Sequence, residues 1–338
     1  MQTSPRILVV RLGRTGDMVM ITPALNALLA AYPDAQIQIL TTLEGRRVLN
    51  GYHARLSRFL IYPSGILGKL LGWHRVLGEL RAQRFAHAYV FEAATRYHKL
   101  LRNVAGSTHL LPSISTERHY CERCLSLVEQ SLDRPVERSW VGLPVNEEGR
   151  GRAAAYLRDH GIEEGACLVG FHATFSSATA LALRKTKARL HRSWPGESFV
   201  RLALLLQQHA QAYKIPLRII MDVLPAERRL VEPIIEESRG SILMVSAPPD
   251  FERYKAVLEQ MSLFVTPDTG PMHIAAAVGT PLVALFSHMS PGDCGPYVPA
   301  RNYTALRAED TCHPERGLAA ISPESVFSAC LPFLSRFS

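Results

Sequence analysis

The sequence predicts an α/β protein of two similar halves, each with a doubly wound parallel sheet, facing each other across a cleft. The chain has 338 residues, more than the ~250–300 at which a single hydrophobic core stops growing. In both halves short β-branched runs alternate with amphipathic helical segments, which is typical of βαβ units. An extended, proline-containing stretch at residues 133–148 separates the two halves. We therefore expect domains at 1–148 and 149–321, followed by a final helix at 322–338.

The first half begins with ILVV, a β-branched strand that leads into a glycine-containing loop and then an apolar helical segment. Later strands are indicated by similar runs, and helices by apolar residues at helical spacing. The expected strands are residues 7–10, 35–42, 56–62 and 88–91. The expected helices are residues 18–31, a stretch beginning at 43, and 67–83, 95–104 and 117–132.

The second half repeats the alternation. Its expected strands are residues 167–171, 217–221, 242–245, 263–266 and 282–285. Its expected helices are residues 150–160, 195–213, 226–238, 254–260 and 271–278, with a last one beginning near Ser322. Ser322 supplies an N-cap and Pro323 suits the first helical position.

The composition predicts a cytoplasmic protein. Hydrophobic residues make up 47% of the chain, but no apolar run reaches the ~18–20 residues of a membrane span. The apolar run at the N-terminus is too short for a secretory signal. The net charge is +8, and residues 46–118 hold twelve basic and three acidic side chains. Such a region either attracts anions or is an ordinary solvated surface. No nucleic-acid-binding signature accompanies it, so nucleic acid is not an expected partner.

Six cysteines are too few and too scattered for a disulfide framework. Cys121 and Cys124 form a CxxC, which could be half of a zinc site, but no second close pair completes it. Helical spacing around them explains both thiols as part of one apolar face. We favour this interpretation over metal binding.

The strongest motif is LFVTPDTGPMHIAAAVGTPLVALF, at residues 263–286. A buried strand ends at Pro267, and a turn of Asp268, Thr269 and Gly270 stands at a helix N-terminus. Exposed N–H groups and the helix dipole make such a turn an anion site suited to a diphosphate. His273, in the first helical turn, could face the same ligand. The alternative is an ordinary connection with an aspartate cap and a core histidine.

A second motif, RLGRTGDMVMITP, occupies residues 11–23. It contains neither a GxGxxG fingerprint nor a Walker A lysine, which disfavours an NAD-dependent oxidoreductase and a P-loop enzyme. Asp17 follows the first strand at its carboxyl end, where open α/β sheets bind ligands. A carboxylate there is either a helix cap or a general base.

The chain resembles glycosyltransferase family 9, the ADP-heptose:lipopolysaccharide heptosyltransferases. The matching segments lie in family order from one end of the chain to the other. They are Gly16-Asp17 with Thr22-Pro23-Ala24-Leu25, Phe171-His172-Ala173-Thr174, Arg192-Ser193-Trp194-Pro195, Asp268-Thr269-Gly270-Pro271-Met272-His273, Asp310-Thr311-Cys312 and Ile321-Ser322-Pro323-Glu324.

The resemblance implies a GT-B fold of two Rossmann-like domains, with the acceptor on the first, the nucleotide-sugar on the second and the final helix packed back on the first. It implies an inverting transfer of heptose from ADP-heptose to a lipopolysaccharide inner-core acceptor at the cytoplasmic face of the inner membrane, where the enzyme would be peripheral. Asp17 would be the catalytic base. The donor-binding residues would be Thr174, Arg192, Asp268, Thr269, Gly270 and His273. The acceptor-side residues would be Arg14, Thr15, Gly16 and Arg96. No cofactor or metal is expected, since basic groups could replace Mg²⁺.

Two features depart from the family pattern. Arg192 stands where the family usually has lysine. Residues 174–192 are longer than usual and contain several basic side chains, as either a lid over the diphosphate or a solvent-exposed insertion. Two alternatives remain open: a GT-B enzyme with another nucleotide-sugar or a protein or other glycan acceptor, and a nucleotide- or carbohydrate-binding protein without catalysis.

Overall fold

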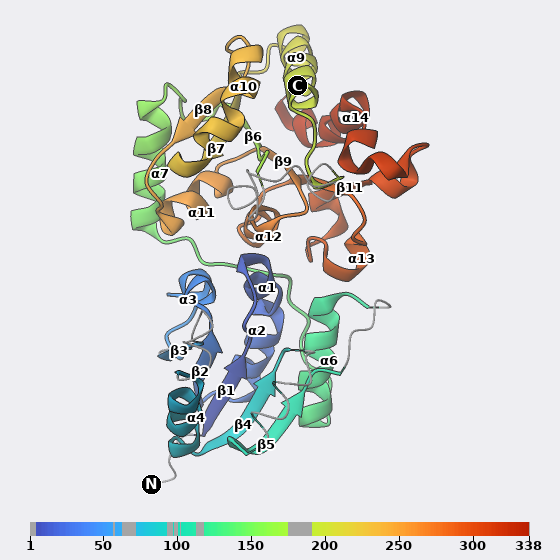
Figure 1. Ribbon diagram of the computed structural model, residues 1–338. Helices are drawn as coiled ribbons and strands as arrows, with labels where there is room; N and C mark the ends of the chain where they lie inside the picture. The colour runs from blue at the N-terminus through green and yellow to red at the C-terminus, as the bar shows by residue number, and fades with distance from the viewer. Residues whose placement is uncertain are drawn as a thin grey trace. The chain divides into compact units, whose positions relative to one another are not determined.

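The computed structural model describes residues 5–56, 58–62, 72–92, 97, 101, 103–112, 118–174 and 191–337. The chain forms two compact units (Figure 1). Unit 1 contains Met1–Pro144 and Gly292–Tyr297, and unit 2 contains Val145–Pro291 and Val298–Ser338. The first boundary lies four residues before the predicted one. The return of residues 292–297 to unit 1 was not predicted.

Unit 1 is built on a five-stranded parallel sheet with the order β3-β2-β1-β4-β5. The strands are β1 (Arg6–Val10), β2 (Gln36–Thr41), β3 (Arg58–Ile61), β4 (Phe85–Val90) and β5 (Ala105–Leu110). The helices are α1 (Thr15–Met20), α2 (Thr22–Ala31), α3 (Leu43–Leu49), α4 (Trp73–Ala82) and α6 (Tyr120–Leu132). The predicted helix at 18–31 is therefore two helices, divided at Ile21.

Unit 2 is built on a six-stranded parallel sheet with the order β11-β10-β9-β6-β7-β8. Its strands are β6 (Cys167–Phe171), β7 (Leu217–Val223), β8 (Leu243–Ser246), β9 (Leu263–Pro267), β10 (Leu282–Phe286) and β11 (Tyr303–Arg307). Its main helices are α7 (Glu147–Asp159), α9 (Gly196–Tyr213), α10 (Arg228–Glu237), α11 (Phe251–Glu259), α12 (Gly270–Ala277) and α14 (Pro323–Leu334). The short helix α13 (Pro291–Cys294) lies at the boundary, and all of it except Pro291 belongs to unit 1. Short 3₁₀ helices are η2 (Pro225–Glu227), η3 (Ala300–Asn302), η4 (Ala308–Asp310), η5 (Pro314–Ala320) and η6 (Ser335–Phe337).

Helices cover both faces of each sheet (Figure 1), because the strands are apolar on both sides, as parallel sheets require. In unit 1, α4 packs on the face that carries Val10 and Val90. The opposite face carries Tyr89, whose hydroxyl lies 2.8 Å from that of Ser131 on α6. Each unit is therefore one Rossmann-like doubly wound domain, as the sequence predicted.

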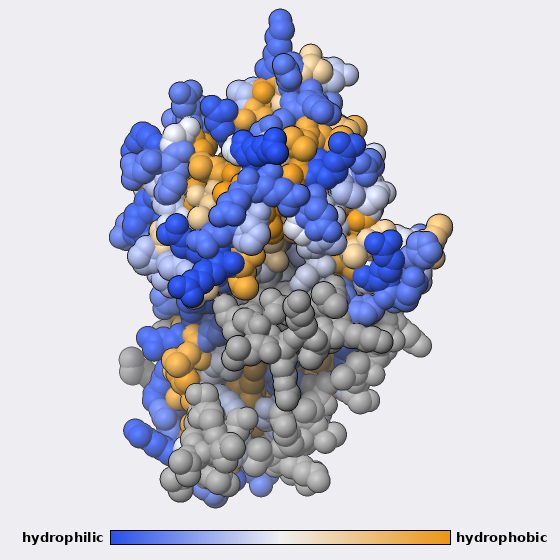
Figure 2. All heavy atoms as spheres, turned by 45° about the horizontal axis from the view of Figure 1, so that its top comes forward, coloured by the Kyte–Doolittle hydropathy of each residue, from blue (hydrophilic) through white to orange (hydrophobic). Residues whose placement is uncertain are grey.

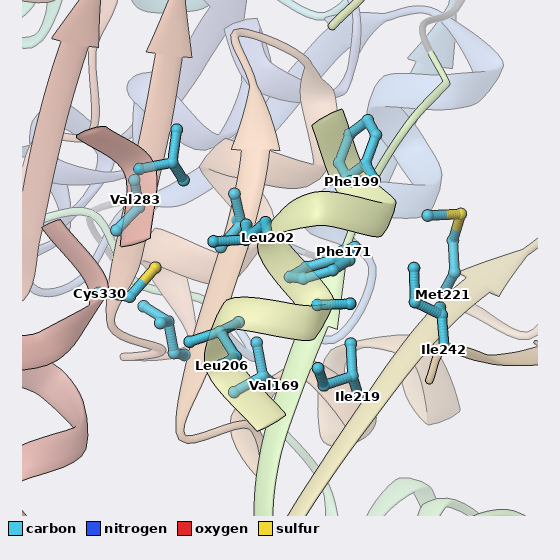
Figure 3. Close-up of a cluster of buried hydrophobic side chains, with 14 of the residues drawn as sticks. Val169, Phe171, Phe199, Leu202, Leu206, Ile219, Met221, Ile242, Val283 and Cys330 are labelled. Atoms are coloured by element: carbon cyan, nitrogen blue, oxygen red, sulfur yellow. The ribbon is translucent and has the colours of Figure 1, made fainter. Parts of the chain in front are cut away.

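The main core of unit 2 lies between its sheet and helices α9, α10 and α14. Figure 3 shows Phe171 and Phe199 close together, with Cys330 of α14 among the same side chains. The predicted start of α14 is confirmed, since the Ser322 hydroxyl accepts the Ser325 N–H at 3.1 Å. The expectation that this helix packs back on the first domain stays a prediction. Its apolar face, through Val326, Cys330 and Leu334, is buried in the core of unit 2.

The sequence analysis did not predict two of the observed strands. Strand β5, AGSTHL, and strand β11, YTALR, lie at the edges of their sheets and pair on one side only. Both sequences mix small and polar residues with few apolar β-branched ones, so they give little signal, whereas the more apolar edge strands β3 and β8 were predicted. The predicted helix at 95–104 lies largely outside the described residues.

In the described part of the chain, the large apolar side chains that remain exposed are scattered: Leu43, Trp140, Leu204, Tyr213, Leu224 and Leu243. The space-filling view shows polar residues over most of the visible described surface, with apolar groups between them (Figure 2). Among the described residues, no single helix is long and apolar enough to cross a membrane. One bent pair of helices, Pro314–Ala320 with Pro323–Leu334, has the length and apolar composition of a membrane span when the two are counted together.

Candidate functional site

The first candidate site lies at the carboxyl ends of β1 and β4, where the strand order of unit 1 reverses. Open α/β sheets bind ligands at such a switch point. Asp17, in the first turn of α1, accepts two hydrogen bonds. Arg11 Nη2 donates to Oδ1 at 2.6 Å and the Arg14 N–H donates to Oδ2 at 2.7 Å. Its side chain is 33% exposed, so the carboxylate is both oriented and accessible.

Gly13 allows this arrangement. A Cβ on Gly13 would lie 2.3 Å from the Cβ of Asp17, so no other residue fits beneath the carboxylate. The same loop is held from outside by Glu44 of α3, which accepts the Thr15 N–H at 2.9 Å and its hydroxyl at 2.5 Å. Thr15 is buried and is thus committed to the loop rather than open to an acceptor. Gly16 is buried and Arg14 is exposed.

Glu92 is a member of this site that the motif search did not single out. It follows β4, accepts the Leu12 N–H at 2.6 Å and lies 3.4 Å from Arg11 Nη1. The Arg11 guanidinium also donates to the Phe91 carbonyl at 3.0 Å, and its central carbon lies 4.7 Å from the centroid of the Tyr120 ring. Burial disfavours the charged form of Arg11, but its anionic neighbours outweigh burial and raise its pKa above the usual value. Arg11 therefore remains a fixed cation that joins two carboxylates.

The basic region of unit 1, which the sequence analysis interpreted as either an anion-attracting or a solvated surface, is partly structural. Arg55 donates to the carbonyls of Leu29, Tyr32 and Pro33 at 2.6–2.8 Å. These groups end α2, and a cation there also complements the helix dipole. Arg58 pairs with Glu79. Other predicted members, Arg96 and Lys69, lie outside the described residues.

The second candidate site lies at the carboxyl ends of β6 and β9, the switch point of the sheet in unit 2. The turn from Asp268 to Gly270 leads into α12, as predicted. The N-cap is Thr269, without a side-chain capping bond, so Asp268 does not cap the helix. The Thr269 hydroxyl lies 3.3 Å from the Pro267 carbonyl, to which it donates. His273 is buried in the first turn of α12.

Arg192 is connected to this turn. Its Nη2 donates to the Asp268 carbonyl at 3.2 Å. Two residues later, the buried Trp194 donates its indole N–H to the Ile321 carbonyl at 2.9 Å, which anchors the segment. Burial raises the pKa of Asp268, while Arg192 and His288 act in the opposite direction. The structure therefore brings Arg192 and the 268–270 turn together.

Gly317 of η5 makes room for the segment before Arg192. It has a φ of +59°, and a Cβ there would lie 2.5 Å from the backbone of His191. The possible basic lid precedes this segment, and residues 178–190 of it lie outside the described residues.

Thr174, expected among the donor-binding residues, already has hydrogen-bond partners within unit 2. The residue is buried. Its hydroxyl donates to Glu227 Oε1 at 3.0 Å and lies 3.4 Å from His172 Nε2. Glu227 Oε2 accepts the Leu224 N–H at 3.1 Å. The sequence analysis missed Glu227, whose only signal was an acidic residue shortly after a strand of a Rossmann-like sheet.

Asp222, at the end of β7, is a second buried carboxylate in this region. Its Oδ1 accepts the Tyr156 hydroxyl at 3.3 Å, whereas Oδ2 has no hydrogen-bond partner among the described residues. Burial raises the pKa of Asp222 to about 6, although Arg253 and Tyr156 act against the shift. Its ionised form is therefore unfavourable in the folded chain.

We expect Asp222→Asn to stabilise the protein above pH 7 and to lose that advantage near pH 4. A raised folded-state pKa stabilises the fold at low pH, and this contribution is lost as pH rises through about 6. From the usual value of 3.8, the shift corresponds to about 3 kcal/mol. Urea unfolding at pH 4 and pH 8 measures it, with the exposed Asp159→Asn as control. An equal difference at both pH values would contradict the assignment.

The cysteines behave as the apolar interpretation predicts. Cys121 and Cys124 are fully buried in α6, and burial raises the pKa of both thiols. Within the described part of the chain, no group of three or more His, Cys, Asp or Glu side chains is placed to hold a metal ion.

Two Rossmann-like units in one chain are the architecture of GT-B glycosyltransferases. The model of glycosyltransferase family 9 (heptosyltransferase) matches residues 92–323, and the chain belongs to this family. A curated relative, the lipopolysaccharide core heptosyltransferase OpsX of Haemophilus influenzae, is 24% identical over 132 residues. That match spans 38% of this chain and 36% of the relative, about a third of its length.

Solved structures show the same fold over the whole chain. A family 9 glycosyltransferase from Veillonella parvula aligns with a TM-score of 0.81, 20% identity and 99% coverage of both chains. ADP-heptose lipopolysaccharide heptosyltransferase II of E. coli aligns with a TM-score of 0.72 at 18% identity, and the alignment covers 98% of this chain and 99% of that one. The E. coli heptosyltransferase WaaC with ADP aligns with a TM-score of 0.70 at 17% identity, and the alignment covers 98% of this chain and 100% of that one.

Proposed function

We propose that this chain is an inverting glycosyltransferase that moves heptose from ADP-heptose to a lipopolysaccharide inner-core acceptor. The observation that carries the proposal is Asp17, an accessible carboxylate oriented by Arg11 and the Arg14 N–H at the switch point of unit 1. Family membership supports it. So do the relatives described as a lipopolysaccharide core heptosyltransferase and as a heptosyltransferase with ADP.

In the proposed reaction unit 1 binds the acceptor. Asp17 takes the proton from the attacking hydroxyl as its oxygen forms the bond to the anomeric carbon. That carbon loses its bond to the donor diphosphate on the opposite side, so the configuration inverts. Glu92, less exposed at 14% against 33% for Asp17, holds Arg11 and the loop in place.

Unit 2 binds the donor. As the sugar–oxygen bond breaks, the diphosphate gains negative charge, and fixed donors that point at it lower the barrier. Arg192, the backbone at Thr269 and Gly270, and His273 are the groups proposed for this task. Asp268 contributes its backbone carbonyl, which accepts a hydrogen bond from Arg192. Glu227 is suited to the ribose hydroxyls, because a carboxylate accepts hydrogen bonds and an acidic residue has this role in Rossmann-like sites.

The proposal includes catalysis without a metal ion, with Arg192 in the place of Mg²⁺. Turnover in EDTA should equal turnover in Mg²⁺. Calorimetry with ADP, UDP, GDP and CDP tests the donor assignment, and ADP should bind at least tenfold more tightly than the others. Preference for UDP or GDP would favour the alternative GT-B enzyme with another nucleotide-sugar.

We further propose that exposed arginines of unit 1 hold the enzyme at an anionic membrane surface, where a lipid-linked acceptor resides. Each basic residue near such a surface contributes about 1 kcal/mol, and salt screens the attraction. The candidates are Arg46, Arg75 and Arg81, which are exposed, rather than Arg55 and Arg58.

Neutralising these three arginines to Gln should reduce sedimentation with anionic vesicles, most clearly at low salt, and leave neutral vesicles unaffected. The matched control neutralises three exposed arginines of unit 2, Arg229, Arg239 and Arg301. Equal loss in both triple variants would assign the binding to net charge alone.

A further inference from the structure

A buried chain of hydrogen-bonding groups runs from the end of β6 to η2 in unit 2. His172 Nε2 lies 3.4 Å from the Thr174 hydroxyl, which donates to Glu227 Oε1 at 3.0 Å. The far oxygen of Glu227 accepts the Leu224 N–H. His172 and Thr174 are both buried, and Glu227 is half-buried at the exposed end of the chain.

The hydrogen count fixes the direction of this chain. The Thr174 hydroxyl has one hydrogen, and the carboxylate of Glu227 can only accept. Because Thr174 donates to Glu227, a hydrogen bond between its oxygen and His172 has the imidazole as the donor, and the Thr174 backbone is a second hydrogen-bond partner of His172. Nε2 of the imidazole therefore carries the proton. Burial lowers the pKa of His172, although Glu227 acts in the opposite direction, so the ring is neutral at pH 7 and has one N–H.

The backbone holds His172 where this bond requires it. The His172 N–H donates to the Val265 carbonyl at 3.0 Å, which continues the pairing of β6 with β9. Its ring lies beside Phe264, with centroids 6.4 Å apart. The imidazole thus belongs to the rigid sheet, whereas Glu227 belongs to a short 3₁₀ turn.

We infer that His172 is a positioning residue for the donor: through the Thr174 hydroxyl it holds the Glu227 carboxylate in the orientation that accepts nucleotide hydroxyl groups. The inference rests on the proposed binding of a nucleotide-sugar to unit 2. It assigns a role to a histidine that the sequence analysis did not place among the donor-binding residues, and it makes Thr174 a link to Glu227 rather than a direct contact of the donor.

The test compares ADP with 2′,3′-dideoxy-ADP, which lacks the ribose hydroxyls, by calorimetry on the whole chain. Wild type should bind ADP more tightly than the dideoxy nucleotide. His172→Leu removes the N–H and should weaken ADP binding about tenfold, the usual scale for a hydrogen bond linked to a charged group. Its affinity for the dideoxy nucleotide should not change.

His172→Gln places an amide N–H near the position of Nε2 and should keep ADP affinity within about threefold of wild type. The exposed His313→Gln is the control for loss of a histidine. Melting temperatures identify a variant that has lost its fold. The protonated ring nitrogen of His172 can be identified in the wild-type protein, without any substitution. Nitrogen NMR should show the proton on Nε2 of His172.

Three outcomes would overturn the inference while leaving the proposed function intact: equal weakening of both nucleotides in His172→Leu, no rescue by Gln, or a proton on Nδ1. Wild type that binds neither nucleotide would contradict the donor assignment as well. The two failures are therefore distinguishable.

Discussion

Asp17→Asn should lower kcat by about 10²–10⁴-fold, the usual contribution of a general base. The amide keeps the size of the side chain and can still accept the Arg14 N–H, but it cannot take a proton from an acceptor hydroxyl. Donor affinity should stay within twofold, because Asp17 belongs to unit 1 and the proposed donor groups belong to unit 2. Steady-state kinetics and ADP calorimetry on the same samples measure both.

Glu92→Gln is the matched control, since Glu92 also contacts Arg11. Its side chain is more buried and accepts the Leu12 N–H, so its loss should loosen the loop and reduce kcat by less than about tenfold. If Glu92→Gln were the more damaging change, the base would have to be reassigned. Near-normal turnover of Asp17→Asn would remove Asp17 from the mechanism.

Arg192→Met should lower kcat by about 10²–10³-fold, the usual cost of deleting one fixed donor to a developing negative charge. Methionine keeps an unbranched apolar side chain beside the turn but removes the charge that bonds to the Asp268 carbonyl. The loss should appear mainly in kcat, because the diphosphate carries more charge in the transition state than in the bound donor.

Arg192→Lys gives the internal comparison. An ammonium restores the charge without the bidentate geometry of guanidinium, so activity should recover to within about tenfold of wild type. The exposed Arg229→Met controls for loss of one positive charge in unit 2. An Arg192→Met enzyme with unchanged kcat would mean that other groups stabilise the leaving group.

The parts of each site that are continuous in sequence could be predicted. Asp17 and the 268–273 turn each follow an apolar strand and open a helix, so the local pattern alone places them at the carboxyl edge of a sheet. The central strands were predicted for the same reason, because burial on both faces demands apolar runs.

The partners that orient these groups could not be predicted, since they come from distant positions. Glu92 meets the Leu12 N–H across 80 residues, and Glu227 meets Thr174 across 53. From the sequence, Arg55 is part of a basic surface. In the structure it binds carbonyls at the end of α2, which lie 22–26 residues earlier in the chain. The apolar pattern of α14 predicts a buried face without showing which unit buries it.

The most direct test of the proposed function supplies wild-type enzyme with ADP-heptose and a heptose-free inner-core lipid acceptor, and follows ADP release and the product by NMR. The account predicts one ADP released for each heptose transferred, with an anomeric configuration opposite to that of the donor. A retained configuration, or ADP release without transfer to the acceptor, would contradict it.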